Sequence, residues 1–522
     1  MTKSLLRLPR HTAYSTPLLE AYFNGKLSLP IVTSDQTGAQ ESLQNAKNNQ
    51  WNRKVLVEVL SEQADQSKAG ILAQKAIEDL IHENTFTVCT AHQSCLFFGP
   101  RYVYFKALSA VKAARMLSSK ENPVYPVFWM GSEDHDFEEI NHIHWEGKKV
   151  RWDHVQGNAV GRMSTQGIDH VIDEVISIAK ASLSSEALQE LNEQLDVWKT
   201  KEDVNYASLW QMALYQLFQD DELIVLNADD YRLKELFAPI MIKELRTDSL
   251  QTCIKTSDEG MFASFSMPLH LRETNLFYIE KGVRQRVELD KNNSSEVEFW
   301  CDKCKRHPEI FSPNVALRPI YQQSILPNVS FVGGPSEVAY WIQLAPAFSM
   351  LNVFYPQILL RDQCIIVNQE LITLQEHNAA SWESLVLGDS AWQDAYLEKF
   401  FEDKLKPIKE AQTSWDKKGQ ELADYARAME EGLGKAYDGA WSKMNKLTSS
   451  LLQKTKRHLK QSHPEIISDW TRLTNAVRPE GILQERYAST LSLIVKKIHS
   501  KEALITAFNP FDQGFHIILE EE

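Results

Sequence analysis

The sequence is poor in the features that mark membrane, secreted and fibrous proteins. In 522 residues, no apolar run approaches the roughly 18 residues that a membrane-spanning helix needs. The opening segment MTKSLLRLPRHTAY has too short an apolar stretch for a secretory signal peptide. Six cysteines are ordinary for a reducing compartment, and 20 Gly with 19 Pro are too few for a low-complexity chain. We therefore expect a cytoplasmic protein with free thiols and no membrane partner.

Positive charge is also in deficit. Lys and Arg number 56 against 70 Asp and Glu, which gives a net charge of −14. Because an acidic chain repels nucleic-acid phosphates, we expect no DNA or RNA partner, although a small anion could still bind in a locally basic pocket. The 13 Trp, 16 Tyr and 22 Phe can fill a large core, which excludes a wholly disordered chain. The length allows about three domains.

Apolar strands alternate with helices through the first two thirds of the chain. The predicted strands are 85–91, 125–130, 223–226, 330–332 and 358–360. Pro100 is predicted as the first residue of a helix that ends near Leu117. This alternation is typical of an α/β fold with a parallel sheet, in which ligands bind beyond the carboxyl ends of the strands.

The chain is predicted to have three parts. A core covers residues 1–370, with hairpin-containing insertions at about 141–200 and 255–320 that each turn at a Gly flanked by Lys. Residues 371–465 are charged and helical, which is typical of a coiled coil. Residues 466–522 regain a globular texture and are predicted to return to the core.

One apolar stripe dominates the predicted coiled coil. Its positions are spaced 3, 4, 4, 3, 4, 4, 3 and 4 residues apart: Leu422, Tyr425, Met429, Leu433, Ala436, Ala440, Met444, Leu447 and Leu451. This eleven-residue repeat, about 3.67 residues per turn, predicts one long helix from about Trp415 to Leu459 with a nearly straight seam. The partner would be the 376–411 helix of the same chain or a second subunit, and we expect a homodimer.

Two polar clusters follow the first two predicted strands. In Thr90-Ala91-His92-Gln93, His92 could donate to a phosphate or an oxyanion, or be a satisfied structural histidine. The segment Glu133–Glu139 holds five carboxylates and His135. Such crowding raises some carboxyl pKa values and suits a general base or Mg²⁺ binding, with Asp134, His135 and Asp136 as candidates and Glu133 as a nucleotide- or substrate-binding residue. The structural alternative is a solvated acidic start of a helix.

A third cluster lies between the fourth strand and a helix. In Gly333-Gly334-Pro335-Ser336-Glu337, the glycines would allow close backbone approach and the helix start would offer N–H groups to an anion. The alternative is a tight turn. Upstream, Arg318 could bind a phosphate or carboxylate, with Gln322 nearby. Cys301 and Cys304 form a lone CxxC pair, half of what a closed zinc site needs, so no zinc is expected.

Four longer strings carry a family resemblance. They are TAHQSCLFFGPRYVYFK (90–106), YPVFWMGSEDHDFEEINH (125–142), FSPNVALRPIYQQSILPNVSFVGGPSEVAYW (311–341) and EGILQER (480–486). They resemble the BshC family, the cysteine-adding enzymes of bacillithiol biosynthesis. The resemblance implies a Rossmann-like core related to nucleotidylyltransferases and class I synthetases, with two insertions and a dimerising coiled coil. The family's Thr-Gly-His-Gln is Thr90-Ala91-His92-Gln93 here, which adds a methyl group near the expected nucleotide.

The reaction implied by the resemblance joins L-cysteine to the amino group of glucosaminyl malate. Because a free carboxylate does not acylate an amine at neutral pH, we expect activation by ATP or another nucleotide. His92 and Lys106 would face phosphate, and Gln93 would bind nucleotide or substrate. Asp134, His135 and Asp136 would bind Mg²⁺ or deprotonate the amine. The expected ligands are phosphate or malyl carboxylates for Arg318, and an ammonium for Glu337.

Two other functions stay open at this stage. The chain could be a nucleotidylyltransferase or synthetase-like enzyme acting on another small substrate. That reading calls for a mobile lysine loop, and Ser442-Lys443-Met444 lies inside the predicted long helix instead. The chain could also be a non-enzymatic dimer that only binds a nucleotide, although binding alone needs fewer carboxylates than the acidic cluster supplies.

Overall fold

The computed structural model describes residues 4–27, 29, 33–154, 159–199, 204–280 and 283–520. Two units divide the chain: residues 1–366 with 485–522, and residues 367–484. The return to the first unit therefore comes at Glu485 and not at about 466. The reason is that helix α20 (Pro464–Val477) packs within the second unit, where Trp470 lies 5.5 Å from Trp392 and donates a hydrogen bond to Asn378.

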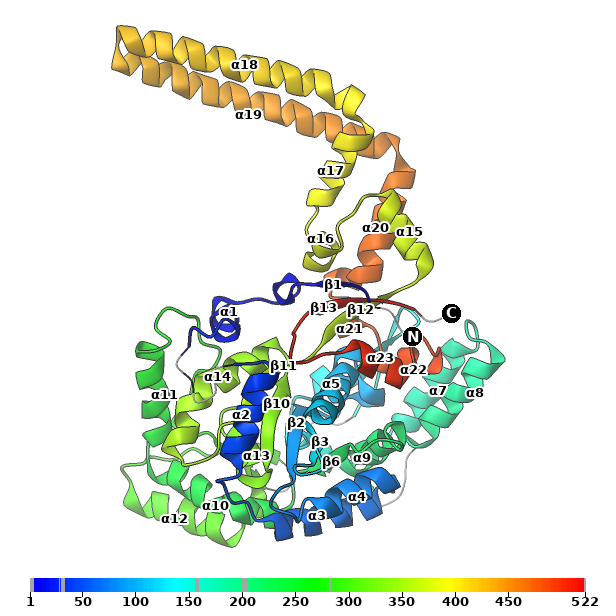
Figure 1. Ribbon diagram of the computed structural model, residues 1–522, viewed down its shortest axis with the longest axis vertical. Coiled ribbons are helices and arrows are strands. Elements are labelled where there is room, and N and C mark those ends of the chain that lie inside the picture. The colour runs from blue at the N-terminus through cyan, green and yellow to red at the C-terminus, as the bar shows by residue number, and fades with distance from the viewer. Residues whose placement is uncertain are drawn as a thin grey trace. The chain divides into compact units, whose positions relative to one another are not determined.

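A five-stranded parallel sheet forms the centre of the first unit (Figure 1). Its order is β11 (Gln357–Leu360), β10 (Asn328–Gly333), β2 (Phe86–His92), β3 (Val124–Met130) and β6 (Ile224–Asn227). Every neighbouring pair is parallel, which confirms the five predicted strands and the α/β class. All of β3 is buried, because helices cover both faces of the sheet.

Alternate strand residues pack against different helices. On one face, Val88, Val332 and Leu359 join the core cluster of α2 (Gln36–Ala46) and α5 (Arg101–Leu117). On the other face, Phe331 stacks on Trp341 of α14 (Pro335–Met350), and Trp129 meets Tyr321 of α13 (Arg318–Ile325). Helix α3 (Arg53–Gln66) borders β6.

Pro100 caps α5 instead of opening it, as its φ of −66° and ψ of 154° show. The carbonyl of this extended residue can still begin the helix. The other helices of the first unit are α1 (Pro17–Phe23), α4 (Ile71–Asp79), α9 (Tyr206–Leu217), α10 (Tyr231–Arg246), α21 (Gln484–Tyr487), α22 (Thr490–Val495) and α23 (Lys501–Ala507).

Each of the two predicted insertions contains a pair of antiparallel strands, as its hairpin-like sequence predicts. The first holds α6 (Phe137–Ile140), β4 (His142–Trp145), β5 (Lys148–Arg151), η3 (Val160–Arg162), α7 (Ile168–Ala179) and α8 (Ser185–Asp196). Its strands turn at Glu146 and Gly147, both with positive φ, the conformation that makes a two-residue hairpin turn favour glycine.

The second insertion contributes a three-stranded sheet of order β8-β7-β9. It holds α11 (Ser249–Glu259), β7 (Leu276–Glu280), β8 (Val283–Arg286), α12 (Ser294–Arg306), η4 (Pro308–Ile310) and β9 (Phe311–Pro313). Its predicted turn at residues 281–282 lies outside the described residues.

A last sheet joins distant parts of the sequence. Strand β13 (Phe515–Leu519) lies between β1 (Ser4–Leu8) and β12 (Gln363–Val367), and it pairs antiparallel with β1. The C-terminal strand thereby holds the N-terminal strand beside the segment that follows β11.

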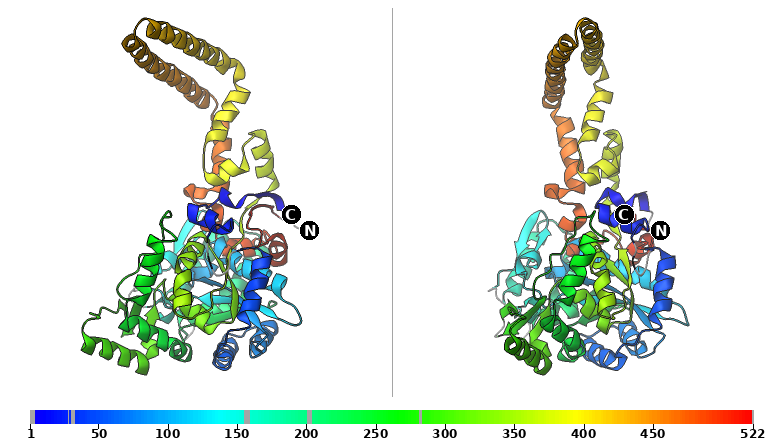
Figure 2. Two further views of the ribbon diagram at one scale, coloured as in Figure 1. Left: turned by 60° about the vertical axis from the view of Figure 1, so that its left-hand side comes forward. Right: turned by 90° about the vertical axis from the view of Figure 1, so that its left-hand side faces the viewer.

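From Gln369 onward, the described residues of the second unit form helices and the loops that join them. It contains α15 (Gln369–His377), α16 (Trp382–Leu387), α17 (Ala391–Phe400), α18 (Glu402–Met429), α19 (Glu431–Ser462) and α20. Figure 2 shows α18 and α19 side by side as a hairpin. The predicted single helix from Trp415 to Leu459 is therefore wrong, because the chain reverses at Glu430, whose φ of −157° and ψ of 133° are extended.

The predicted stripe is not the contact between these helices. All nine stripe positions are exposed, while the hairpin buries Gly419, Ala423 and Ala426 of α18 against Gly434 and Thr448 of α19. At 100° per residue, the stripe residues of each helix lie about a quarter turn from its buried residues, and the antiparallel arrangement puts both stripes on one side. A groove of about 610 Å³ between Trp415 and Leu451 marks that side.

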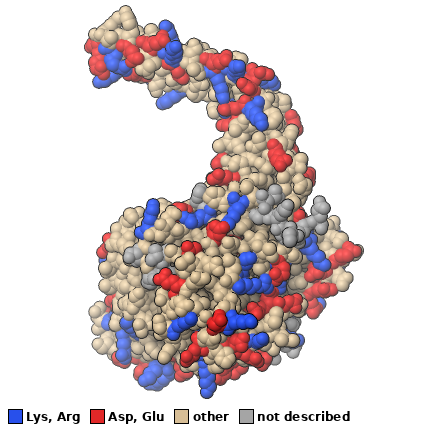
Figure 3. Space-filling model, viewed as in Figure 1, with Lys and Arg blue, Asp and Glu red and all other residues tan. Residues whose placement is uncertain are grey.

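The helices of the described residues do not meet the needs of a membrane span, because none combines the length and the apolarity that crossing a membrane requires. On the face drawn in Figure 3, Lys and Arg are interspersed with Asp and Glu, so this face carries no extended patch of one sign.

Substitutions at two glycines test the hairpin packing. A Cβ on Gly419 would lie 1.9 Å from the Trp441 ring, whereas one on Gly439 would meet nothing within 4 Å. We expect Gly419→Ala to lower the free energy of unfolding of the helical unit by about 1–3 kcal/mol through overpacking. Gly439→Ala should raise it by up to about 1 kcal/mol through helix propensity. Urea unfolding followed by far-ultraviolet circular dichroism measures both, and equal effects would contradict this packing.

Candidate active site

A pocket of about 610 Å³ lies at the carboxyl ends of β2, β3 and β10. It is lined by residues of the loops after these strands, by α5, and by β7, β8 and the segment after β9 of the second insertion. The predicted site residues that line it are His92, Gln93, Lys106, Glu133, Asp134, Arg318, Gly334, Ser336 and Glu337. Three separate polar clusters of the sequence thus meet at one edge of the sheet.

Four predicted residues do not line this pocket. His135 and Asp136 are exposed on the loop before α6, because the chain turns away from the sheet after Asp134. Gly333 is the buried end of β10, where a Cβ would lie 2.9 Å from the Phe331 ring, so it serves packing and not ligand approach. Gln322 is buried behind Arg318.

His92 is held by two hydrogen bonds. Its Nδ1–H donates to the Gln93 carbonyl at 3.0 Å, which leaves Nε2 to accept from the Tyr102 hydroxyl at 2.9 Å. Burial, followed by the Lys106 charge, lowers the pKa of His92 to about 3. His92 is therefore neutral at physiological pH, and a phosphate would have to displace the Tyr102 hydroxyl to reach Nε2. The predicted phosphate contact stays a prediction.

Lys106 and Glu337 form an ion pair at the pocket wall. Lys106 is 3% exposed and also donates to the Ala91 carbonyl at 2.9 Å. Glu337 accepts from the Gly334 N–H at 2.9 Å, and burial opposes its ionisation but is outweighed by Lys106, so its pKa is lowered. Since the two charges neutralise each other, neither is a free partner for phosphate or ammonium in this arrangement.

Arg318 is oriented by its own neighbours. It donates to the Tyr340 hydroxyl at 2.7 Å and to Gln322 Oε1 at 3.2 Å. Gln322 therefore positions the guanidinium that lines the pocket. Five donors in a planar fork leave Arg318 N–H groups to bind an oxyanion.

Five arginines that line the pocket were not predicted, and two of them lie on one strand. Arg284 and Arg286 lie on β8, and their guanidinium carbons are 4.0 and 4.8 Å from the Phe277 ring centroid. Arg284 also donates to His135 Nδ1 at 2.9 Å. A signal was present in the sequence, since arginines two apart on a predicted strand share one face. Together with Arg318, they make this side of the pocket cationic.

A fully buried ion pair supports the opposite wall. The Arg361 guanidinium lines the pocket and binds the Glu485 carboxylate through both terminal nitrogens, at 2.5 and 2.9 Å. Both side chains are 0% exposed. The neighbouring Arg486 lies over the Tyr102 ring at 5.3 Å. Sequence reasoning used the EGILQER string as a family mark and missed this structural role.

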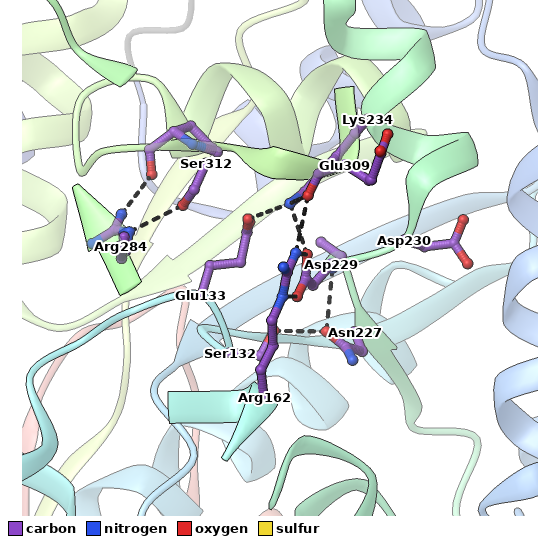
Figure 4. Close-up of polar contacts among 12 residues, drawn as sticks. Ser132, Glu133, Arg162, Asn227, Asp229, Asp230, Lys234, Arg284, Glu309 and Ser312 are labelled. Carbon is purple, nitrogen blue, oxygen red and sulfur yellow. Dashed lines mark hydrogen bonds and ion pairs between the residues drawn. The ribbon is translucent and has the colours of Figure 1, made fainter. Parts of the chain in front are cut away.

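Figure 4 shows a second charged cluster, which includes the pocket-lining residue Glu133. Lys234 of α10 contacts Glu133 Oε1 at 2.5 Å and Asp229 Oδ1 at 2.7 Å. Arg162 donates to both oxygens of Asp229, at 2.6 and 2.7 Å, and to the Glu309 carbonyl at 2.9 Å. The cluster thus joins the ends of β3 and β6 to both insertions.

The acidic loop does not gather metal ligands. Asp134 accepts from Gln93 Nε2 at 2.8 Å, while Asp136 is exposed outside the pocket. Within the described ranges, no group of three His, Cys, Asp or Glu residues could hold a metal ion. Cys301 and Cys304 are buried in α12, and burial raises the pKa of both thiols. Mg²⁺ binding by this loop therefore stays a prediction.

The fold and the pocket define an α/β protein whose site lies at the carboxyl edge of a Rossmann-like sheet, with a helical hairpin unit appended. The family model described as Bacillithiol biosynthesis BshC, N-terminal Rossmann-like domain, matches residues 7–362. The model described as Bacillithiol biosynthesis BshC, C-terminal coiled-coil domain, matches residues 364–520. The chain belongs to the BshC family.

Relatives agree with this assignment over nearly their full lengths. A protein of Flavobacterium johnsoniae is 31% identical over 97% of this chain and 98% of its own length. One of Cytophaga hutchinsonii is 30% identical over 91% and 90%, and one of Bacillus cytotoxicus 25% over 86% and 87%. Each bears the name "Putative cysteine ligase BshC". The predicted family, its Rossmann-like core and its coiled-coil unit are thereby confirmed.

The Arg361–Glu485 pair yields a stability prediction. Glu485→Gln would leave the buried Arg361 charge without a counter-charge, so we expect the free energy of unfolding to fall by about 3–5 kcal/mol. The matched control is Glu298→Gln, which removes an exposed partner of Arg246 and should change stability by less than about 0.5 kcal/mol. Urea unfolding followed by tryptophan fluorescence measures both. A loss as small as the control's would show that water reaches Arg361.

Proposed function

We propose that this protein is the ligase that joins L-cysteine to the amino group of glucosaminyl malate, the last step of bacillithiol biosynthesis. The observation that carries the proposal is family membership over both units, residues 7–362 and 364–520. The names of the relatives supply the cysteine ligase class. The amino-sugar substrate and the activation step are our inference from chemistry and from the pocket.

The polarity of the pocket supports this substrate. Glucosaminyl malate carries an ammonium and two carboxylates on one molecule. The side of the pocket built by Arg284, Arg286 and Arg318 suits the malyl carboxylates, because guanidinium groups bind carboxylates through paired hydrogen bonds. The loop after β3 supplies Glu133 for the ammonium. Anion and cation sites thus lie in one pocket, as the substrate requires.

Amide formation also needs an activated acyl group. We propose that a nucleoside triphosphate converts the cysteine carboxylate into an acyl phosphate or acyl adenylate, since water does not leave from a free carboxylate at neutral pH. The cationic side of the pocket would receive the phosphates. The amine then forms the C–N bond, and the C–O bond to phosphorus breaks with its electron pair leaving on the phosphate oxygen.

The deciding experiment incubates the protein with L-cysteine, glucosaminyl malate and ATP, GTP or CTP in turn, and detects bacillithiol by mass spectrometry. We expect bacillithiol to form with one of the three nucleoside triphosphates and not to form when all of them are omitted. Glucosamine in place of glucosaminyl malate should react more slowly by at least about tenfold, because it lacks the carboxylates that the arginines bind. Product without any nucleotide would contradict the activation step, and no product with any nucleotide would contradict the ligase function.

We also propose that the protein is a homodimer in which the apolar side of the α18–α19 hairpin meets a second copy. The stripe residues Tyr425, Met444, Leu447 and Leu451 are 48–66% exposed, and exposed apolar surface of this extent is typical of an interface. The stripe residues of both helices lie on one side, so two hairpins could close a four-helix arrangement. Of the two partners that the sequence left open for the stripe, the 376–411 helix and a second subunit, we propose the second subunit.

Charged substitutions on the two sides of the hairpin test the dimer. Tyr425→Glu with Leu447→Glu should give a monomer in sedimentation analysis, because each unpaired buried charge costs several kcal/mol. The control pair, Gln420→Glu with Ser442→Glu, places the same charges at the groove on the other side of the hairpin and should leave a dimer. A monomeric wild type, or a dimeric stripe variant, would contradict the proposed interface.

A further inference from the structure

We propose that Glu133 is the catalytic carboxylate that receives the attacking ammonium of the amino sugar and takes its proton, while Lys234 acts as its positioning residue. This inference rests on the proposed ligase function. It also changes the sequence-based assignment, in which Asp134, His135 and Asp136 were the candidates for the base.

The position of Glu133 supports this role. It lies three residues after Met130, the end of β3, and its side chain lines the pocket while only 14% exposed. Lys234, 1% exposed on α10, contacts Glu133 Oε1 at 2.5 Å. Glu133 is therefore fixed on rigid elements with one side toward the ligand space, as a group that must meet a reacting atom requires.

The other carboxylates of the pocket and of the acidic loop have partners of their own or lie outside the pocket. Glu139, which also lines the pocket, is exposed on α6 and hydrogen-bonded to Gln93. Asp134 accepts from Gln93 and lies 3.7 Å from the Arg284 guanidinium. Glu337 is neutralised by Lys106. Asp136 is exposed and does not line the pocket. The cation that Glu133 contacts, Lys234, also binds Asp229.

Two carboxylates share Lys234 and have opposite tendencies to bind a proton. Burial raises the pKa of Glu133 above its ordinary value. Burial also opposes ionisation of Asp229, but Lys234 and the two Arg162 hydrogen bonds outweigh it and hold the pKa of Asp229 below its usual range. Such a separation between neighbouring carboxyl groups is typical of acid–base sites. A proton arriving at this cluster would therefore go to Glu133, the member that faces the pocket.

The titration of Glu133 depends on charged groups from several elements. These are Lys234 of α10, Asp229 after β6, Arg284 of β8, Arg162 of η3 and the hydroxyl of Tyr321 on α13. The cations favour the ionised carboxylate and the anions oppose it. An incoming ammonium adds one positive charge beside Glu133 and initially favours the ionised, proton-accepting form.

The proposed step balances as follows. The ammonium gives one proton to Glu133, and the free amine attacks the carbonyl carbon of the cysteinyl acyl phosphate or adenylate. After the C–N bond has formed, the nitrogen carries a second proton to be lost, and this proton leaves to solvent. The bond between the acyl carbon and the phosphate oxygen breaks, and the phosphate departs with that electron pair. The products are the amide, the phosphate or nucleoside monophosphate, and two protons, one of them held by Glu133 until it exchanges with water.

The first test measures binding without any reaction. Calorimetry would compare glucosaminyl malate with its N-acetyl derivative, which has no ammonium, in the absence of cysteine and nucleotide. We expect Glu133→Gln to weaken binding of glucosaminyl malate about tenfold or more, because a charge-assisted hydrogen bond is lost. Binding of the N-acetyl derivative should be unchanged. Equal effects on both compounds would overturn the ammonium site.

The second test uses the pH dependence of the rate. Glu133→Gln should lower kcat about a hundredfold or more at neutral pH, the usual range for loss of a general base. The ratio of wild-type to variant rates should then fall as the pH rises, because an amine that is already free needs no base. A merely structural defect would lower the rate by the same factor at every pH, and a ratio independent of pH would overturn the base role.

Two further variants keep the result interpretable. Glu133→Asp retains a carboxylate and should recover part of the lost rate. Glu138→Gln is the matched control on the same acidic segment, since Glu138 is 55% exposed, pairs with Arg151 and does not line the pocket; it should behave as wild type in both tests. Circular dichroism checks that each variant is folded. The two proposals can fail separately. If the wild type makes no bacillithiol but Glu133→Gln weakens the binding of glucosaminyl malate and not of its N-acetyl derivative, the ligase function is contradicted and the ammonium site is supported.

Discussion

Charge that is taken out of water must be paired, and this constraint organises the whole site. Three buried cations line the pocket or contact a residue that does, and each pairs with a carboxylate far away in the chain: Lys106 with Glu337, Arg361 with Glu485, and Lys234 with Glu133. An unpaired charge at any of these positions would cost several kcal/mol. The pairs therefore link the strand ends, the insertions and the C-terminal segment into one rigid frame, which leaves Arg284, Arg286 and Arg318 facing the ligand space.

The sequence predicted the sheet well because its signals are local. Five short apolar runs became five parallel strands, and the polar loops after three of them met at one edge. The roles within the site were harder to predict, because they depend on partners far away in the chain. In the sequence, Lys106 is a candidate for binding phosphate, but in the fold it is paired with Glu337. Glu133 and Asp136 are equivalent in the sequence, but in the fold Glu133 lines the pocket and Asp136 is exposed outside it.

The helical unit was misread for a different reason. The spacing of the stripe continues through Glu430 without a break, and no proline marks the reversal there. Small residues such as Gly419 and Gly434 form the contact between the helices, and they carry no hydrophobic signal. Periodicity therefore found the exposed apolar side of the hairpin and missed the buried one.

The Arg361–Glu485 pair also has a consequence for synthesis of the chain. Its members are 124 residues apart, and the whole helical unit is encoded between them. At roughly 5–20 residues per second, the ribosome adds Glu485 about 6–25 seconds after Arg361. During this interval Arg361 has no counter-charge. Strand β1 is unpaired for longer still, until β13 has been synthesised. The helical unit can fold while the Rossmann-like unit is incomplete, so the pocket wall is completed only after Glu485 and Arg486 have been synthesised.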